Sequence, residues 1–435
     1  MKKTIKLAFT AVLVLGTTSA FATNGSAMIG MGAKSRGMAG VGIGMSHGAE
    51  STLTNPAMIT TIEDTEISFG GTFFMPDVKN SNTLVLPTGS AGSKPTGQTN
   101  DSTTATSKAD LSVIPEVSIA GKVTNNFYMG VGMWGTAGMG VDYRDAHNSG
   151  QMNMVTNLQL MQFGVPLAYK MSNFSIAITP LLQYGSLDVN YVISPHLQNA
   201  MYYMQTGSMG GATTPMNISM GVAQDLKFGY NIGVAYTIAN VKLGAVYKSK
   251  IDMEYNGFHN VVAPMAPGYT NDKLSTPAEI GLGLSYTMQE HTIAFDYKVI
   301  QWSKAKGYED FEWNDQNIIG LGYEYNTKGW GLRVGYNYAS SPISEKKVIN
   351  PQTDKRNSAG LQPGVINTFN LLGFPGIVES HYALGGSYDL TKQTSIDLAY
   401  TYAPQVSNTY KNFVGQKITT KHSQTGLTFQ LNYIF

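Results

Sequence analysis

The last nine residues of the chain alternate between apolar and polar side chains. Leu427, Phe429, Leu431, Tyr433 and Phe435 are apolar, and Thr, Gln and Asn occupy most of the positions between them. A spacing of two places the odd positions on one face of a β-strand. A strand of this kind that ends on an aromatic residue is typical of the closing strand of an outer-membrane β-barrel. Such a barrel limits the function to transport, adhesion or chemistry at the lipid side.

The first 22 residues predict the compartment. Three lysines precede an apolar run from Leu7 to Leu15, and Ala20-Phe21-Ala22 forms an A-x-A cleavage site. We interpret residues 1–22 as a secretory signal peptide. The apolar run is too short for a membrane-spanning helix, which needs roughly 20 residues. We therefore expect a protein of the outer membrane of a Gram-negative bacterium.

Composition excludes several other classes. Without the three lysines of the signal peptide, 26 of the 29 basic residues remain against 28 acidic ones, so no basic surface favours nucleic acid. There is no cysteine, which excludes disulfide scaffolds and thiolate metal sites. After the signal peptide no 18-residue apolar stretch occurs, although 42% of the chain is hydrophobic. In a barrel these residues are spread over an alternating outer face.

The same alternation recurs along the chain, as in residues 228–236, 293–299 and 332–338. We interpret the apolar face as lipid-facing and the mixed face as lumenal. Short polar breaks read as periplasmic turns and longer polar stretches as extracellular loops. The predicted turns are Thr124-Asn125-Asn126, Ser172-Asn173, Ala239-Asn240, Gln289-Glu290, Asn326 to Gly329 and Thr391 to Thr394, and the predicted loops are Asp77 to Asp110, Ser194 to Gln224, Asn256 to Lys273 and Ser341 to Ile377.

Counting the segments between breaks predicts an all-β fold, a 14-stranded antiparallel transmembrane β-barrel over residues 65–435. Counts of 12 and 16 strands are alternatives, because such barrels have even strand numbers.

Residues 23–64 do not alternate. They are rich in glycine, and interspersed methionines such as Met28, Met31 and Met38 give this segment something to bury. It is either a disordered tail or an N-terminal hatch folded in the lumen, and only the hatch would bury those side chains.

No catalytic arrangement is evident, so we do not expect an enzyme. The seven histidines are scattered and form no H-x-x-x-H pair, and there is no G-x-S-x-G motif. Gly40-Val41-Gly42-Ile43-Gly44 lacks the strand and the βαβ context of a dinucleotide-binding loop. The sequence therefore predicts neither a cofactor nor a metal.

The segment from Gly30 to Gly48, followed by Asn55-Pro56-Ala57, resembles the hatch of the FadL-type outer-membrane transporters of long-chain fatty acids and other hydrophobic compounds. Residues 247–252, 277–279 and 302–303 are similar to later landmarks of that family. The resemblance implies a 14-stranded barrel, a lumenal hatch closed by Asn55, Pro56 and Ala57, and a kinked third strand whose gap leads sideways into the bilayer.

The predicted third strand is Phe127 to Ala137. Gly135, Gly138 and Gly140 follow one another closely there, and because glycine weakens strand pairing, they are our candidates for a lateral gate. The alternative is a loop of ordinary glycine turns.

A hydrophobic ligand would first meet apolar residues in the loops. The candidates for this groove are Met201, Tyr202, Tyr203, Met204, Phe258, Val261 and Val262. We expect the ligand to pass into the lumen, the hatch to move, and the ligand to leave sideways by passive diffusion.

A buried fatty-acid carboxylate needs a cation or several donors. The basic residues that fatty-acid members of the family carry on lumenal strands five and ten correspond to Gly185 and Asn314 here, which raises the case for neutral aromatic hydrocarbons as an alternative. Lys170, Lys248 and Arg333 are the candidate partners for a carboxylate.

Two further alternatives are a general porin and an adhesin, neither of which explains the hatch motif. The expected partners are a hydrophobic small molecule, outer-membrane lipids and, through the C-terminal Phe435, the barrel assembly machinery. We expect a monomer.

Overall fold

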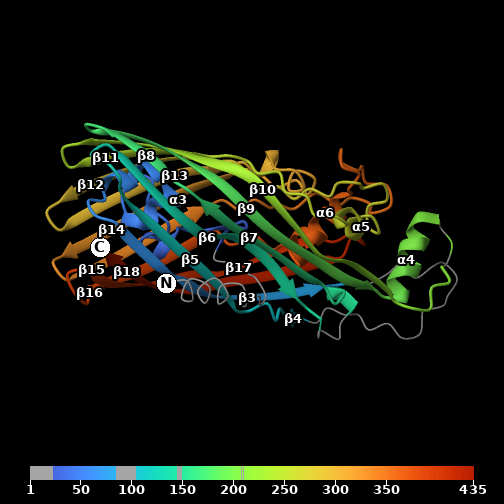
Figure 1. The fold of residues 1–435 in the computed structure, drawn as a ribbon. Helices are drawn as coiled ribbons and strands as arrows, with labels where there is room; N and C mark the ends of the chain where they lie inside the picture. Colours follow the sequence, from blue (N-terminus) through green and yellow to red (C-terminus); the bar gives the residue numbers. More distant parts are fainter. Residues whose placement is uncertain (1–22, 85–103, 145–148, 207, 209) are drawn as a thin grey trace, which may run out of the picture.

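The computed structural model describes residues 23–84, 104–144, 149–206, 208 and 210–435. The signal peptide predicted for residues 1–22 lies outside the described residues. The described chain forms a long barrel of tilted strands, with most of the N-terminal segment enclosed at one end and the helices of the long loops gathered at the other (Figure 1).

Antiparallel strands form the wall, and each pairs with the next along the chain. β18 pairs with β3 and closes the ring. β7 and β8 form one wall strand that is interrupted at Val165 and Pro166, since both pair with β6 and with β9. Over the described residues this gives a closed 14-stranded barrel, as predicted. The wall strands are β3 (Glu66–Asn82), β5 (Ser112–Lys122), β6 (Phe127–Asp142), β7 (Val155–Gly164), β8 (Leu167–Met171), β9 (Phe174–Ile193), β10 (Met216–Ile238), β11 (Val241–Lys248), β12 (Glu279–Met288), β13 (His291–Ile300), β14 (Gln316–Thr327), β15 (Trp330–Ala339), β16 (Ser380–Asp389), β17 (Thr394–Lys411) and β18 (Lys417–Ile434).

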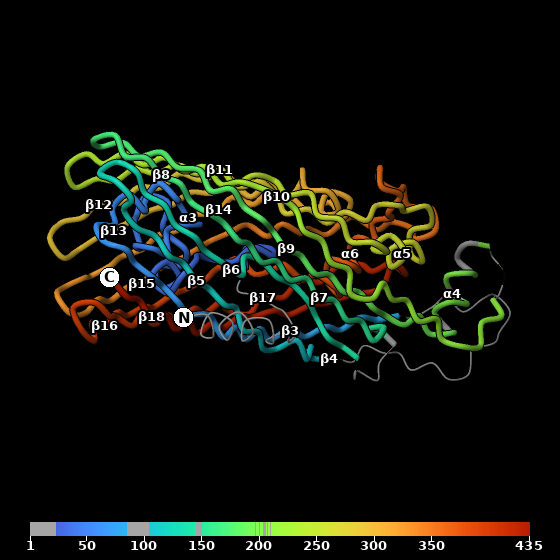
Figure 2. The backbone as a smooth tube through the Cα atoms, viewed as in Figure 1, coloured from blue at the N-terminus to red at the C-terminus, as the bar shows by residue number. Residues whose placement is uncertain are grey.

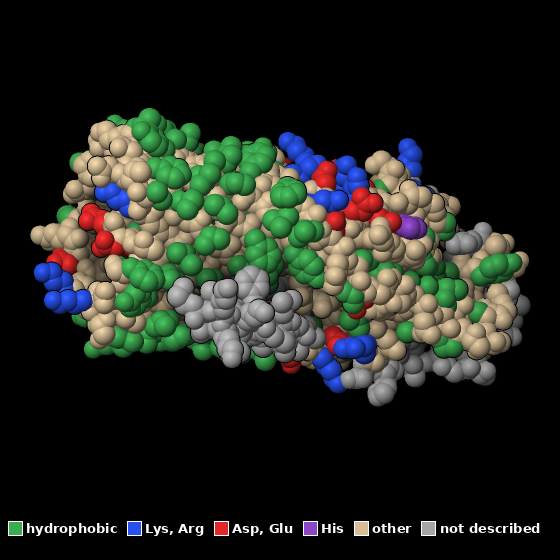
Figure 3. All heavy atoms as spheres, viewed as in Figure 1, with side chains coloured by type: hydrophobic (Ala, Val, Ile, Leu, Met, Phe, Trp, Pro, Cys, Tyr) green, Lys and Arg blue, Asp and Glu red, His purple; other side chains and the backbone are tan. Residues whose placement is uncertain are grey.

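The predicted alternation matches the two faces of the wall. In β18, Leu427, Phe429 and Leu431 are exposed on the outside, whereas Thr428 and Gln430 are buried toward the lumen. Hydrophobic side chains cover the visible wall between zones of charged residues (Figure 3). This is the pattern of a wall that faces lipid.

Short turns join the strands at one end and long segments at the other (Figure 2). Two of the predicted loops were too long. β3 continues to Asn82 and β10 already begins at Met216, because the strands extend beyond the apolar zone, where polar side chains are tolerated on both faces. The third wall strand, β6, likewise runs on to Asp142.

The remaining elements lie in the hatch or in the long loops. None of the helices in the described ranges is long and apolar enough to cross a bilayer. The hatch elements are β1 (Thr23–Asn24), β2 (Ala27–Met28), α2 (Gly32–Gly37), η1 (Gly48–Glu50), α3 (Ser51–Thr54) and η2 (Pro56–Thr61), and the loop elements are β4 (Thr104–Thr106), η3 (Ser149–Gln151), α4 (Pro195–Thr206), α5 (Phe258–Val262), η4 (Trp302–Lys304), α6 (Pro363–Thr368) and η5 (Phe369–Gly373).

The hatch segment lies within the ring of strands, in the half nearest the short turns (Figures 1 and 2). Its apolar side chains are buried as predicted. Met28, Met31 and Leu53 share a cluster with wall residues, and Met38 and Val41 share another with Ala294 of β13.

Candidate functional site

A buried ion pair joins the hatch to the wall. Arg36 of α2 contacts Glu116 of β5, and both residues are 2% exposed. The second oxygen of Glu116 accepts a hydrogen bond from Gly32 N at 2.7 Å, and Arg36 Nη1 donates to Thr72 Oγ1 of β3 at 2.6 Å. α2 is therefore fixed to two neighbouring strands through charge-assisted bonds.

The loop after α2 is held on the opposite wall. Asp296 of β13 accepts hydrogen bonds from Gly42 N at 2.8 Å and Ile43 N at 2.9 Å. Ser285 of β12 donates its hydroxyl to Gly44 O at 2.7 Å. The hatch backbone therefore approaches the wall closely enough for short side chains to bind it.

The Asn55-Pro56-Ala57 motif connects two parts of the hatch to β10. Asn55 Oδ1 accepts a hydrogen bond from Ala57 N at 3.1 Å and caps η2, which starts at Pro56. Asn55 Nδ2 donates to Ile43 O at 2.7 Å and to Val234 O at 3.2 Å. A Cβ at Gly233 would lie only 2.2 Å from Asn55 Oδ1, so a glycine is needed there.

Burial changes the ionisation of two hatch side chains. It raises the pKa of the Glu50 carboxyl to about 8, although the nearby Lys34 ammonium opposes this shift. It lowers the pKa of the His47 imidazole to about 4. At neutral pH both groups are mostly uncharged, which suits a plug packed against apolar side chains.

The wall has a gap beside β6. Pairing between β5 and β6 ends at Glu116 and Trp134, and the register of β6 against β7 shifts between Gly135 and Ala137, leaving Thr136 as an extra residue. Directly beyond this bulge the β5 side of β6 is bonded to the hatch, and at Asp142 it is bonded to Ser107 and Lys108. Ala137 pairs with Ala27 of β2.

The hatch also binds the next candidate glycine of the gate, because Gly138 N donates to Ser26 O at 3.1 Å. A Cβ at Gly135 would lie 2.6 Å from the side chain of Ile114 on β5. The predicted gate glycines thus lie in the segment where the strand pairing of β6 changes from β5 to the hatch. In this part of the wall, β2 takes the place of β5 beside β6.

A small lumenal cavity of about 40 Å³ lies behind this segment. One side is apolar, and the other carries the ion pair of Lys248 and Glu279, with Nζ and Oε2 3.3 Å apart. The cavity is too small for an acyl chain, since ligand pockets usually measure about 300–1,000 Å³. Its lining includes Ala27, Met28, Met31, Thr136, Ala137, Leu160, Leu181, Trp302 and Tyr308.

The candidate residues of the loop groove are not brought together on an open surface. Phe258, Val261 and Val262 of α5 are fully buried, and Phe258 packs edge-on against Tyr269 and Phe311. The expectation that these three line an open groove was wrong for this state, because α5 packs over the barrel mouth and its apolar face forms the core of the loop region.

The other groove candidates belong to α4, which projects beyond the barrel (Figure 1). Tyr202 is exposed, and Met201 is half-buried against the loop core. The side chains of Tyr203 and Met204 lie outside the described residues.

The three basic candidates differ in their availability. Arg333 on β15 is buried and pairs with Glu324 at 2.7 Å and with Asp397 at 3.7 Å, and Lys248 pairs with Glu279. Both cations are already neutralised. Among the described residues, the Lys170 ammonium on β8 makes only a long hydrogen bond, 3.4 Å, to Thr60 O of the hatch. Lys170 alone of the three therefore keeps most of its donor capacity.

Sequence reasoning missed the carboxylates that neutralise these cations, although two pairs are direct cross-strand neighbours, Lys248 with Glu279 and Arg333 with Glu324. It also missed the ion pair of Arg36 and Glu116. No group of three or more His, Cys, Asp or Glu side chains that could hold a metal ion occurs in the described part of the chain.

A family model described as "Outer membrane protein transport protein (OMPP1/FadL/TodX)" matches residues 13–361, which is more than half of the chain. The protein belongs to this family. Its members are transport channels and not enzymes. The OMPP1/FadL/TodX chain described here is accordingly an outer-membrane transporter of hydrophobic compounds.

Named relatives are similar over most of this OMPP1/FadL/TodX chain. A long-chain fatty acid transport protein of Escherichia coli O6:H1 is 22% identical over 76% of this chain and 81% of its own length. A 47 kDa outer membrane protein of Pasteurella multocida is 23% identical over 91% of this chain and 92% of its own.

Two solved structures share the fold. A Pseudomonas aeruginosa FadL homologue superposes with a TM-score of 0.70 at 17% identity, covering 94% of this chain and 100% of its own. The toluene transporter TodX of P. putida gives 0.64 at 18% identity, covering 94% and 99%. At such identity these likenesses describe the architecture and do not choose between the two substrates.

Proposed function

We propose that this protein is a channel for the passive uptake of long-chain fatty acids, which pass the hatch and leave sideways through the gap beside β6. The observation that carries the proposal is the pairing of Ala27 with Ala137, by which the hatch takes the place of β5 beside β6. Withdrawal of β2 would open a path from the lumenal cavity to the bilayer. Because a hydrophobic molecule partitions into lipid spontaneously, no energy source is required.

A reversible cross-link between hatch and gate tests this route. The chain has no cysteine, and antiparallel partners such as Ala27 and Ala137 have the Cα separation that a disulfide needs. We expect the oxidised A27C/A137C variant to lose uptake of radiolabelled oleate by proteoliposomes, and we expect reduction to restore it. Each single substitution serves as a control. Unchanged uptake by the oxidised double variant would refute lateral exit through this gap.

The second candidate cargo is a neutral aromatic hydrocarbon. It is favoured by the pairing of Arg333 and Lys248 with carboxylates, because a neutral ligand does not need a free cation in the lumen. A toluene transporter is also among the proteins of the same fold. Competition by toluene and by oleate against a fluorescent fatty acid distinguishes the two: displacement by oleate alone supports the fatty-acid proposal, and displacement by both supports the neutral cargo.

Other features of the assembly stay predictions. A monomer and recognition by the assembly machinery through Phe435 are expected for this protein. The porin alternative is disfavoured because the hatch occupies the lumen in the half nearest the short turns, and an adhesin would not need a hatch that pairs with β6. Adhesion measured for a variant with the hatch deleted tests the adhesin alternative, since adhesion through the loops would survive the deletion.

A further inference from the structure

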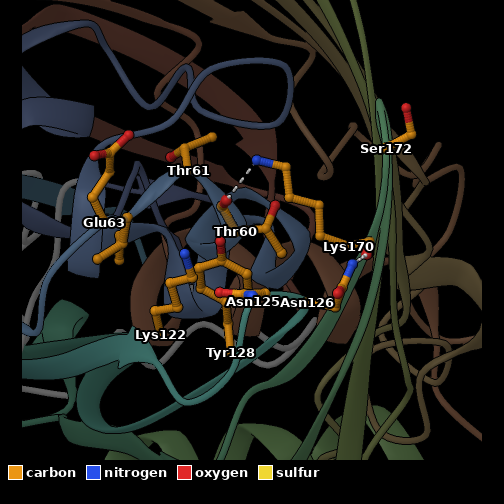
Figure 4. Close-up of a pocket in the computed structure, with 10 residues that line it drawn as sticks. Thr60, Thr61, Glu63, Lys122, Asn125, Asn126, Tyr128, Lys170 and Ser172 are labelled. Atoms are coloured by element: carbon orange, nitrogen blue, oxygen red, sulfur yellow. Dashed lines mark hydrogen bonds between the residues drawn. The ribbon is translucent and has the colours of Figure 1, made fainter.

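A pocket of about 330 Å³ lies beneath the hatch, at the end of the barrel with the short turns. Its roof is the end of the hatch, Thr60 to Glu63, and its sides come from the β5–β6 and β8–β9 turns (Figure 4). We call it the periplasmic pocket, because outer-membrane barrels have their short turns on that side. It is about eight times larger than the lumenal cavity of about 40 Å³.

Several hydrogen-bond donors face the periplasmic pocket without a partner. Within the described residues, Lys122 forms no ion pair or side-chain hydrogen bond, and Lys170 forms only the long bond to Thr60 O. The Tyr128 hydroxyl and the Asn125 amide also line the pocket, and neither makes a hydrogen bond to another described residue. Two ammonium groups, a hydroxyl and an amide can together satisfy the oxygens of one anion.

The single acidic residue among the lining residues, Glu63, does not neutralise these lysines. No ion pair joins Glu63 to Lys122 or Lys170 in the described ranges, and in Figure 4 its carboxylate points away from both ammonium groups. By contrast, two cations of the lumen, Lys248 and Arg333, each have a carboxylate partner. Lys122 and Lys170 face the pocket with no carboxylate partner among the described residues.

We propose that the periplasmic pocket binds the anionic headgroup of an amphiphile, with Lys122 and Lys170 as its ligands. The lining is mainly polar, and Ile62 is its one aliphatic side chain, so the pocket takes a charged oxygen group and leaves the hydrocarbon tail elsewhere. A carboxylate and a lipid phosphate share this chemistry. The first would come from a fatty acid that has passed the hatch, and in that form the inference rests on the proposed function. The second would come from the inner leaflet.

The position of the pocket implies a second way out of the barrel. Thr60 Oγ1 bonds Ser175 Oγ of β9 at 2.7 Å, and Lys170 holds Thr60 O. These contacts hold the end of the hatch against β8 and β9. An acid headgroup that replaces Thr60 O on Lys170 would loosen the end of the hatch, so that a charged cargo favours release on the periplasmic side whereas a neutral cargo does not.

A single cysteine at Ser172, which lines the pocket, provides a reporter in the otherwise cysteine-free full chain. The S172C protein is labelled with a fluorophore and titrated with 5-doxyl-stearate, whose nitroxide lies near the carboxylate, and with its uncharged methyl ester. We expect the acid to quench at a concentration about tenfold lower than the ester, which corresponds to about 1.4 kcal/mol. The K122Q/K170Q variant should lose this difference, and K392Q, which removes an exposed lysine of another short turn, should retain it.

The following results overturn or refine the inference. Equal quenching by acid and ester, or an unchanged preference in K122Q/K170Q with native far-UV circular dichroism, refutes the site. If the double variant does not fold, K122Q alone decides, because Lys122 has no contact to lose. Relief of quenching by unlabelled oleate but not by phosphatidylglycerol assigns the site to cargo, and the reverse assigns it to membrane lipid. Uptake of radiolabelled oleate by proteoliposomes is measured in parallel, and its absence would refute the fatty-acid transport function while leaving the headgroup site standing.

Discussion

Replacing Glu116 by glutamine tests whether the buried ion pair holds the hatch against the wall. Arg36 and Glu116 are each 2% exposed, and Arg36 Nε has no hydrogen-bond partner. The carboxylate of Glu116 therefore compensates the guanidinium charge almost alone. Removing one partner of a buried pair costs about 3–5 kcal/mol, because the other charge stays buried. The glutamine oxygen can still accept the bond from Gly32 N, so we expect the lower end, about 3 kcal/mol.

This cost appears as easier opening of the hatch. At about 1.4 kcal/mol for each factor of ten, E116Q should accelerate the amide exchange of residues 30–45 about a hundredfold, measured by hydrogen–deuterium exchange and mass spectrometry. The double variant R36M/E116Q should recover most of the protection, because it buries no unpaired charge. D77N breaks the exposed pair of Asp77 and Lys79 and should change protection by less than about 1 kcal/mol.

The reasoning would be refuted by either of two results. If E116Q changes exchange in residues 30–45 by less than about threefold, the pair does not hold the hatch. If R36M/E116Q exchanges as fast as E116Q, the effect comes from lost packing and not from an unpaired charge.

Further predictions concern the hatch motif and its pH dependence. N55A removes the bonds to Ile43 O and Val234 O and the cap of η2, and it should weaken the protection of hatch amides from exchange by about 2–4 kcal/mol. G233A should act similarly, because its new Cβ meets Asn55. Normal exchange in both variants would contradict the assigned role of the motif. The folded-state pKa of Glu50 is raised from 4.5 to about 8, so its stabilising effect is complete below about pH 4.5 and decreases as the pH rises toward 8. Hatch exchange, corrected for its intrinsic pH dependence, should accelerate over that range, and E50Q should abolish this trend; an identical trend in E50Q would show that another group titrates.

The strand pattern was predictable from sequence because the bilayer imposes a strict rule. Every outward side chain of β18 within the apolar zone meets lipid, and the alternation of Leu427, Thr428 and Phe429 is its direct consequence. The rule ends where the strand leaves the membrane. This is why the polar parts of β3 and β10 resemble loops in the sequence, although they are regular strands.

The site was less predictable, because its properties depend on pairing between distant residues. Sequence alone shows that Arg333 and Lys248 are basic, but their availability depends on the carboxylates opposite them, and those follow from strand register. The apolar residues of α5 presented a similar difficulty. A phenylalanine in a long loop, such as Phe258, can face solvent or fill the core of that loop. Its packing against Phe311 in the folded chain shows that it fills the core.

The two routes out of the barrel require different parts of the hatch to move. Lateral exit needs only the β1–β2 hairpin to withdraw, which breaks the bond between Gly138 N and Ser26 O, the bond from Thr23 N to Gln424 Oε1 and the bond between Ser26 Oγ and the Tyr308 hydroxyl. Each bond contributes about 0.5–1.5 kcal/mol net, and the buried ion pair of Arg36 stays intact while the hairpin withdraws. Three residues separate β2 from α2, and they can extend over roughly 10–14 Å, so the hairpin can withdraw while α2 stays docked. Periplasmic release instead requires displacement of the hatch end at Thr60. E116Q should therefore loosen α2 without increasing lateral uptake in proportion, and a parallel rise in both would mean that the hatch moves as one unit.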